Sequence, residues 1–130
     1  MAFRLPIRKI EPKAKPVKDK GYLSWVHQLP CIITGTSPVE AAHLSTGNAM
    51  YGHSGRGMGQ KASDRWALPL CPEKHREQHE GNEIVFWYRH GIDPYKMALI
   101  LHGLYCEGNL DLALTVVKIQ AAARRDNDYV

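Results

Sequence analysis

The sequence predicts an α+β domain, and three observations support this fold class. Two short apolar segments, residues 39–44 and 66–70, have the length of β-strands and flank a long glycine-rich loop. Helix signals dominate the remainder, where Pro72 and the Asp93-Pro94 pair suit the first turn of a helix. The length of 130 residues fits one domain that can bury a core without disulfide bonds.

The first twenty residues predict a flexible basic arm. Residues 1–20 hold seven Lys or Arg against Glu11 and Asp19, a local charge of +5, whereas the remaining residues hold ten basic and eleven acidic side chains. Three prolines favour an extended backbone in this segment. Such an arm can contact nucleic-acid phosphates, and a solvated tail is the alternative interpretation.

Residues 21–130 are predicted to form a single domain, with a central unit at about 39–81 and a helical extension at 82–126. A short helix is expected at 21–29, before Pro30. After the two strands, Pro72 should begin a helix that ends near Gly81. Apolar residues at helical spacing then predict helices at about 82–90, 94–105 and 109–125.

Three histidines are candidates for chemistry in the central unit. His43 lies near the end of the first strand, and His75 and His79 lie four residues apart on the helix that begins at Pro72. That spacing places both imidazoles on one helical face, about one turn apart. A His-x-x-x-His pair on a helix has suitable geometry for one divalent metal ion.

The loop at residues 45–63 is long enough to indicate a function, because structureless loops of this length are uncommon in small domains. It is not a triphosphate-binding P-loop, since Gln60 separates Gly59 from Lys61. His53, Arg56 and Lys61 could contact a nucleic-acid strand, and simple solvent exposure of each is equally consistent with the sequence.

Composition narrows the cellular setting. No apolar run has the roughly 18 residues that a membrane helix needs, and the N-terminal segment carries charges where a signal peptide would be apolar. Three scattered cysteines do not form a disulfide framework and fit a reducing compartment. We therefore expect a cytoplasmic protein with no membrane partner.

Four motifs occur in one order: Tyr22 to Cys31, Ala42-His43-Leu44, Gly57 to Asp64, and Phe86-Trp87 through Pro94. Together they resemble the HNH (ββα-metal) nucleases, in particular a small branch common in phages and prophages, over about residues 20–105. The resemblance implies a ββα-metal (His-Me finger) motif with a two-stranded hairpin, surrounded by N- and C-terminal helices.

The resemblance also implies a metal-dependent endonuclease that hydrolyses phosphodiester bonds of DNA, used in recombination or DNA processing in a bacterial host cell. His43 would be the general base, and His75 and His79 would bind one divalent ion (Mg, Mn, Ni or Zn). Besides DNA, a recombination or phage protein is a candidate partner. In the alternative assignment, His43 is a metal ligand and His53 acts as the base.

The sequence departs from the family pattern at several positions. Ala42 stands where many relatives have a third metal ligand, and Asp64 could supply the missing oxygen. The family's Asn is absent near Trp66, and Thr34 and Lys74 replace two cysteines of a structural zinc site in relatives, so we expect Cys31 and Cys71 to be buried packing residues. These departures leave open a second function, a catalytically weak or inactive ββα module that binds DNA or another protein.

Overall fold

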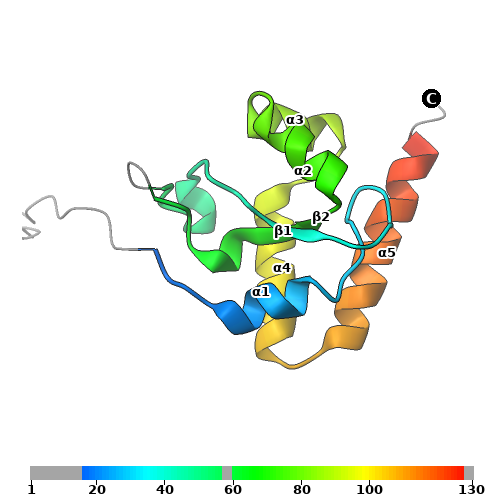
Figure 1. The fold of residues 1–130 in the computed structure, drawn as a ribbon, viewed down its shortest axis with the longest axis horizontal. Coiled ribbons are helices and arrows are strands. Elements are labelled where there is room, and N and C mark those ends of the chain that lie inside the picture. Colours follow the sequence, from blue (N-terminus) through cyan, green and yellow to red (C-terminus); the bar gives the residue numbers. More distant parts are fainter. Residues whose placement is uncertain (1–15, 57–59, 128–130) are drawn as a thin grey trace, which may run out of the picture.

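The computed structural model describes residues 16–56 and 60–127 of the chain. It is an α+β fold of five helices and one two-stranded sheet, as the sequence predicts (Figure 1). The elements in chain order are α1 (Lys20–Val26), β1 (Glu40–His43), the 3₁₀ turns η1 (Ala49–Tyr51) and η2 (Asp64–Trp66), β2 (Ala67–Leu70), α2 (Pro72–His79), α3 (Glu83–Arg89), α4 (Pro94–Cys106) and α5 (Leu110–Asn127).

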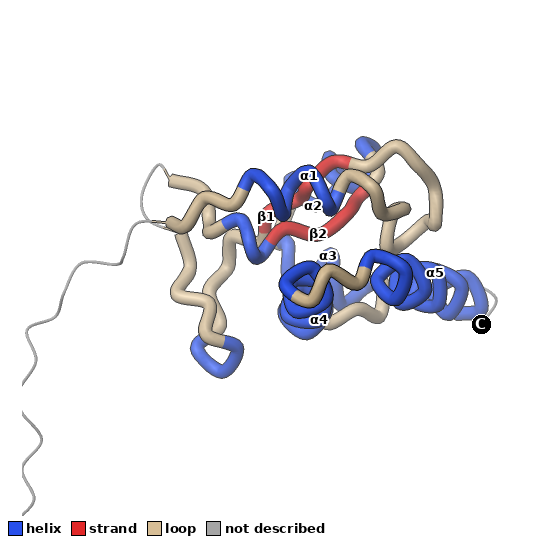
Figure 2. The backbone as a smooth tube through the Cα atoms, turned by 90° about the horizontal axis from the view of Figure 1, so that it is seen from below, coloured by secondary structure: helices blue, strands red, loops and turns tan. Residues whose placement is uncertain are grey.

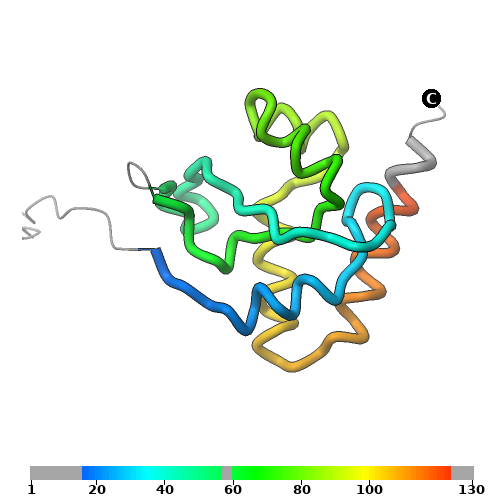
Figure 3. Tube along the Cα trace, viewed as in Figure 1, coloured from blue at the N-terminus to red at the C-terminus, as the bar shows by residue number. Residues whose placement is uncertain are grey.

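The two strands form an antiparallel hairpin in which Ala42 pairs with Leu68 and His43 pairs with Ala67. Side chains alternate between the faces of a strand, so neighbouring residues of β1 have different surroundings. Ala42 is fully buried, whereas Ala41 and His43 are partly exposed on the other face. Figure 3 follows the chain from β1 through the long loop back to β2. The hairpin therefore presents His43 on its outer face.

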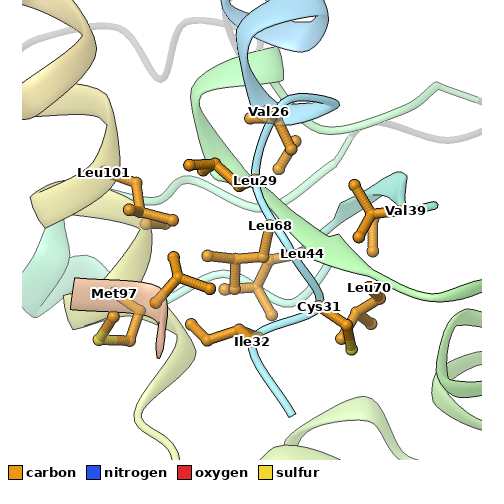
Figure 4. Close-up of a cluster of buried hydrophobic side chains, with 14 of the residues drawn as sticks. Val26, Leu29, Cys31, Ile32, Val39, Leu44, Leu68, Leu70, Met97 and Leu101 are labelled. Carbon is orange, nitrogen blue, oxygen red and sulfur yellow. The ribbon is translucent and has the colours of Figure 1, made fainter. Parts of the chain in front are cut away.

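Helices cover both sides of the hairpin. Figure 2 shows α1 on one side of the strands and α4 on the other, and both helices contact β2. The helix α2 follows β2 directly and packs against both strands and α3. The core between these layers is apolar, as Figure 4 shows, with fully buried side chains that include Val26, Ile32, Leu44, Leu68 and Leu101.

Polar caps explain where three of the helices begin. The Asp19 carboxylate accepts a hydrogen bond from the Tyr22 backbone N–H at the start of α1, and Asn82 and Asp93 cap α3 and α4 in the same way. Pro72 occupies the first turn of α2, where its missing N–H has no cost. These starts agree with the predicted ones to within a residue. Because α2 begins directly after β2, its first residue also sets the direction in which His75 and His79 point relative to the hairpin.

The C-terminal helix α5 packs on α4 at the edge of the molecule, through buried Ala113, Val117 and Ala121. Its opposite side exposes Leu112 and Ile119. It spans 18 residues. Neither α5 nor any other helix in the described part of the chain is long and apolar enough to cross a membrane.

Two segments that were predicted to be irregular are held in place. The predicted arm reaches residue 20, but Val17 accepts a hydrogen bond at its carbonyl from the Asp64 N–H over 3.0 Å. The predicted boundary at residue 20 thus falls inside α1, which begins at Lys20, and residues 1–15 lie outside the described residues. In the loop that was predicted to be structureless, the 3₁₀ turn η1 forms and Asn48 makes a β-bridge with His53. Residues 57–59 of this loop also lie outside the described residues.

Candidate functional site

An open cleft of about 450 Å³ lies where α1, β1, α2 and the long loop meet. Five of the seven predicted site residues line it: His43 from β1, His75 and His79 from α2, and Arg56 and Lys61 from the loop. Leu23, His27, Ala41 and Ser45 complete its lining. The fold thus brings together predicted site residues up to 36 positions apart in the sequence, from His43 to His79, and gathers imidazoles beside cationic side chains.

The ring of His43 is held by Asp64. Its Nε2 lies 2.8 Å from Asp64 Oδ1, and the two side chains are 17% and 13% exposed. The backbone carbonyl of His43 accepts a longer contact of 3.4 Å from Gln78 Nε2 on α2. His43 is therefore fixed at its ring by the end of the loop and at its backbone by α2.

His75 and His79 form a close pair on α2. Their Nε2 atoms are 3.1 Å apart, and the His75 Nδ1 lies 2.9 Å from Oε1 of Glu40, the first residue of β1. A carboxylate can only accept, so the neutral His75 ring is protonated at Nδ1 and presents a lone pair at Nε2. Carboxylate partners orient metal-binding histidines in the same way.

The geometry of this pair fits two adjacent ligands of one cation. Two nitrogens bound at about 2.0–2.1 Å to one ion lie about 2.9–3.4 Å apart for bond angles between about 90° and 110°. The observed 3.1 Å falls in that range. Within residues 16–56 and 60–127, however, no group of three or more His, Cys, Asp or Glu could hold a metal ion. The protein would thus contribute two nitrogens, and water or substrate oxygens would complete the coordination.

Asp64 does not join the histidine pair as the third ligand that the sequence suggested. Both of its carboxylate oxygens are engaged, since Oδ1 faces His43 and Oδ2 accepts a hydrogen bond of 2.6 Å from the Asp19 backbone N–H. Asp64 is also absent from the cleft lining. The contacts of Asp64 make it a partner of His43, which does line the cleft.

His53 is a structural residue and does not contact solvent as a strand-binding residue would. It is 2% exposed, its Nε2 lies 2.6 Å from the Leu44 carbonyl, and its Nδ1 accepts from the Gly55 N–H over 2.8 Å. Its ring stacks on Trp66 at a centroid distance of 4.5 Å. With both ring nitrogens engaged, His53 is suited neither to phosphate contact nor to acting as the base.

Tyr95 anchors the beginning of the same loop. Its hydroxyl donates to the Thr46 carbonyl over 2.8 Å, and its side chain is 2% exposed. Burial, followed by the nearby negative charge of Glu83, raises the pKa of the Tyr95 hydroxyl to about 12. Together with His53, this contact fixes the loop on both sides of η1 and leaves Arg56 and Lys61 at the cleft.

Sequence reasoning missed two members of the site. His27, at the end of α1, is exposed and lines the cleft, and its Nδ1 lies 2.7 Å from the Leu23 carbonyl. Glu40 had no assigned role, although it holds His75. No local sequence motif indicates either residue. His27 lines the cleft only because α1 packs beside it, and Glu40 contacts His75, which is 35 positions away in the sequence.

The positions of Cys31 and Cys71 agree with the prediction that they are buried packing residues. Cys31 and Cys71 are both buried and not disulfide-bonded, and Thr34 links them through contacts of 3.5 Å to the Cys31 sulfur and 3.8 Å to the Cys71 sulfur. Burial raises the pKa of the Cys31 thiol, but hydrogen bonds from Thr34 and from backbone N–H groups outweigh it and lower the pKa overall. Cys31 and Cys71 are thus joined by hydrogen bonds through Thr34 in a buried part of the fold.

Comparison with known proteins places the chain in a family. Residues 8–104 match the family described as "Protein of unknown function (DUF968)". The chain is also 38% identical over 83 residues to the uncharacterized protein YdfU of Escherichia coli K12, a stretch that covers 64% of this chain and 22% of that protein. The chain therefore spans about a fifth of the length of this relative. No solved structure matches it. Because the family match covers well over half of the sequence, the chain belongs to the DUF968 family.

Proposed function

We propose that this chain is a metal-dependent DNA endonuclease of the HNH (ββα-metal) type. The observation that supports it most is the shared cleft, where His43 on the hairpin and the His75–His79 pair on the following helix meet Arg56 and Lys61. A strand histidine beside a helical histidine pair is the arrangement that the sequence resemblance implies. By the same resemblance, the biological role would be DNA recombination or processing in a phage or prophage.

In this proposal His43 is the general base that takes a proton from the attacking water. An ordinary imidazole has a pKa of about 6.5 and is mostly neutral at pH 7, so it can accept a proton without prior ionisation. The ring of His43 is partly exposed at the cleft, and Asp64 fixes its orientation. A fixed and accessible base satisfies the first requirement of phosphodiester hydrolysis.

His75 and His79 would hold the divalent cation. When bound, such an ion supplies charge neutralisation at the phosphate oxygens and at the leaving oxygen. Two imidazole nitrogens favour Zn²⁺, Mn²⁺ or Ni²⁺ over Mg²⁺, which prefers oxygen ligands. Glu40 keeps the Nε2 lone pair of His75 directed at this position by binding the proton on Nδ1.

Arg56 and Lys61 would contact the phosphates of the DNA strand that enters the cleft. Both side chains line the cleft from the loop. The backbone at Val17 to Asp19 is hydrogen-bonded to Ser63 and Asp64, so this part of the basic N-terminal sequence is tied to the carboxylate that holds His43. DNA affinity should therefore depend strongly on salt, as expected for binding through phosphates.

Cleavage of supercoiled plasmid tests the proposal directly. We expect nicking with Mn²⁺, Ni²⁺, Zn²⁺ or Mg²⁺ that chelator abolishes and that loss of the cation ligand in His75→Ala strongly reduces. His43→Ala should reduce nicking at least about 100-fold, the usual scale for losing a general base. Arg56→Ala should weaken DNA binding, whereas Lys118→Ala, an exposed cation on α5, should not. Absence of cleavage with every metal, on duplex and branched DNA alike, would refute the proposal.

A second function, a module that binds DNA without cutting it, is favoured by one observation. Within the described ranges the protein offers only two nitrogens at the proposed cation position, and Asp64 faces His43. In that case plasmid would be retained in a gel-shift assay without nicking. Binding of Mn²⁺ or Zn²⁺ to the wild-type protein, lost in His75→Ala, separates an inactive module from a nuclease that requires an unusual substrate.

A further inference from the structure

We infer that Asp64 is a positioning residue that holds neutral His43 as the Nε2-protonated tautomer, which leaves Nδ1 as the basic nitrogen. The structural part of this inference concerns the imidazole proton and is independent of activity. Its catalytic meaning rests on the proposed function, in which His43 is the base.

The contact between the two side chains defines where the proton lies. Asp64 Oδ1 is 2.8 Å from His43 Nε2, and an ionised carboxylate has no proton to donate. The Nε2 atom must therefore carry the hydrogen of the bond. In a neutral ring this leaves the lone pair on Nδ1, and only Nδ1 can accept a proton from water.

Asp64 is itself held by the N-terminal segment. The Asp19 N–H donates to Oδ2 over 2.6 Å, and the Asp64 N–H donates to the Val17 carbonyl over 3.0 Å. The Val17 N–H in turn donates to Ser63 Oγ over 3.0 Å. Asp19 also caps α1 through Tyr22, so this segment is tied to a helix. Each carboxylate oxygen thus has one defined donor, and the side chain cannot turn without losing both bonds.

This arrangement makes Asp64→Asn an informative variant. A backbone N–H can only donate, so the amide oxygen of the new side chain must face Asp19. The amide NH₂ group, which can only donate, then faces His43 Nε2. To accept that hydrogen bond, the neutral ring must move its proton to Nδ1. The shape of the site is preserved, but the lone pair of the neutral His43 ring is now on Nε2, which faces residue 64. Nδ1 carries the proton and can no longer accept one from water.

Nitrogen NMR of protein labelled with ¹⁵N-histidine reads the tautomer without any cleavage assay. We would record wild type and Asp64→Asn at an alkaline pH where imidazoles are neutral, and assign His43 by the signals missing from His43→Gln. Wild type should show a protonated Nε2 and a bare Nδ1, and the variant should show the reverse. A bare Nε2 in wild-type His43, or the same tautomer in both proteins, would overturn the inference.

Kinetics of the same proteins add the catalytic readout. If His43 is the base, Asp64→Asn should lower kcat by about 10²- to 10⁴-fold, as tautomer exchange does in other His–carboxylate pairs, with little change in KM. Loss of kcat in a variant that unfolds at the wild-type temperature and shows the exchanged tautomer supports the inference. An exchanged tautomer in a protein whose wild type cleaves no DNA supports the positioning role and refutes only the proposed function. An exchanged tautomer with unchanged kcat overturns the catalytic part.

Discussion

Two neighbouring alanines on β1 give a sharp test of the hairpin register, because each would carry a new carboxylate into a different environment. Ala42 is fully buried and pairs with Leu68, whereas Ala41 is partly exposed and lines the cleft with His43. The family resemblance suggests a metal ligand directly before His43, at position 42. The register predicts that a carboxylate can reach the cleft from position 41 and not from position 42.

The magnitudes differ enough to measure. In Ala42→Asp the carboxylate would lie in the apolar core without a charged partner, which costs about 3–5 kcal/mol of the roughly 5–15 kcal/mol that stabilises a typical domain. At about 3–5 °C per kcal/mol for a chain of this size, Tm should fall by about 10–20 °C. Ala41→Asp stays partly solvated and should change stability by no more than about 1 kcal/mol.

Circular dichroism melting and calorimetric titration with Mn²⁺ distinguish the two variants. We expect Ala41→Asp to melt near the wild-type temperature and to bind Mn²⁺ more tightly, since a carboxylate would join His75 and His79. The combined variant Ala41→Asp and His75→Ala is the control, and it should lose that gain. Equal Tm values for the two aspartate variants, or tighter Mn²⁺ binding by a stable Ala42→Asp protein, would refute the register and the placement of the cleft.

Three further predictions concern stability and DNA binding. The raised pKa of Tyr95 keeps its hydroxyl protonated in the fold while the unfolded chain ionises near pH 10, so the free energy of unfolding should fall between about pH 10 and pH 12. Tyr95→Phe should show a smaller fall, and an identical pH dependence would contradict this reasoning. Leu68→Ala should lose about 2–5 kcal/mol in urea unfolding because Leu68 is fully buried, whereas Leu112→Ala on the exposed side of α5 should change stability by less than about 1 kcal/mol. Deletion of residues 1–15 should reduce the slope of log K for DNA against log salt, because five Lys or Arg are removed; an unchanged slope would show that they contact no phosphate.

Several helix starts could be predicted from the sequence because their causes are local. Asp93-Pro94 and Pro72 act through the conformations and hydrogen bonds of adjacent residues, so each start is encoded within one turn of the chain. The i, i+4 spacing of His75 and His79 likewise fixes their proximity once the helix forms, and their Nε2 atoms lie 3.1 Å apart. The α+β class followed from these same local patterns.

The roles of Asp64 and His53 depended on contacts that no local pattern encodes. Asp64 was expected to complete a metal site, but the Asp19 backbone N–H, 45 positions away, and the ring of His43 take both of its oxygens. His53 was expected at the surface of a flexible loop, but stacking on Trp66 and two hydrogen bonds bury it. The sequence by itself determined which side chains could act and which helices would carry them. Only the tertiary structure decided their partners, because a hydrogen bond between distant residues depends on how the hairpin, α1 and the loop pack together.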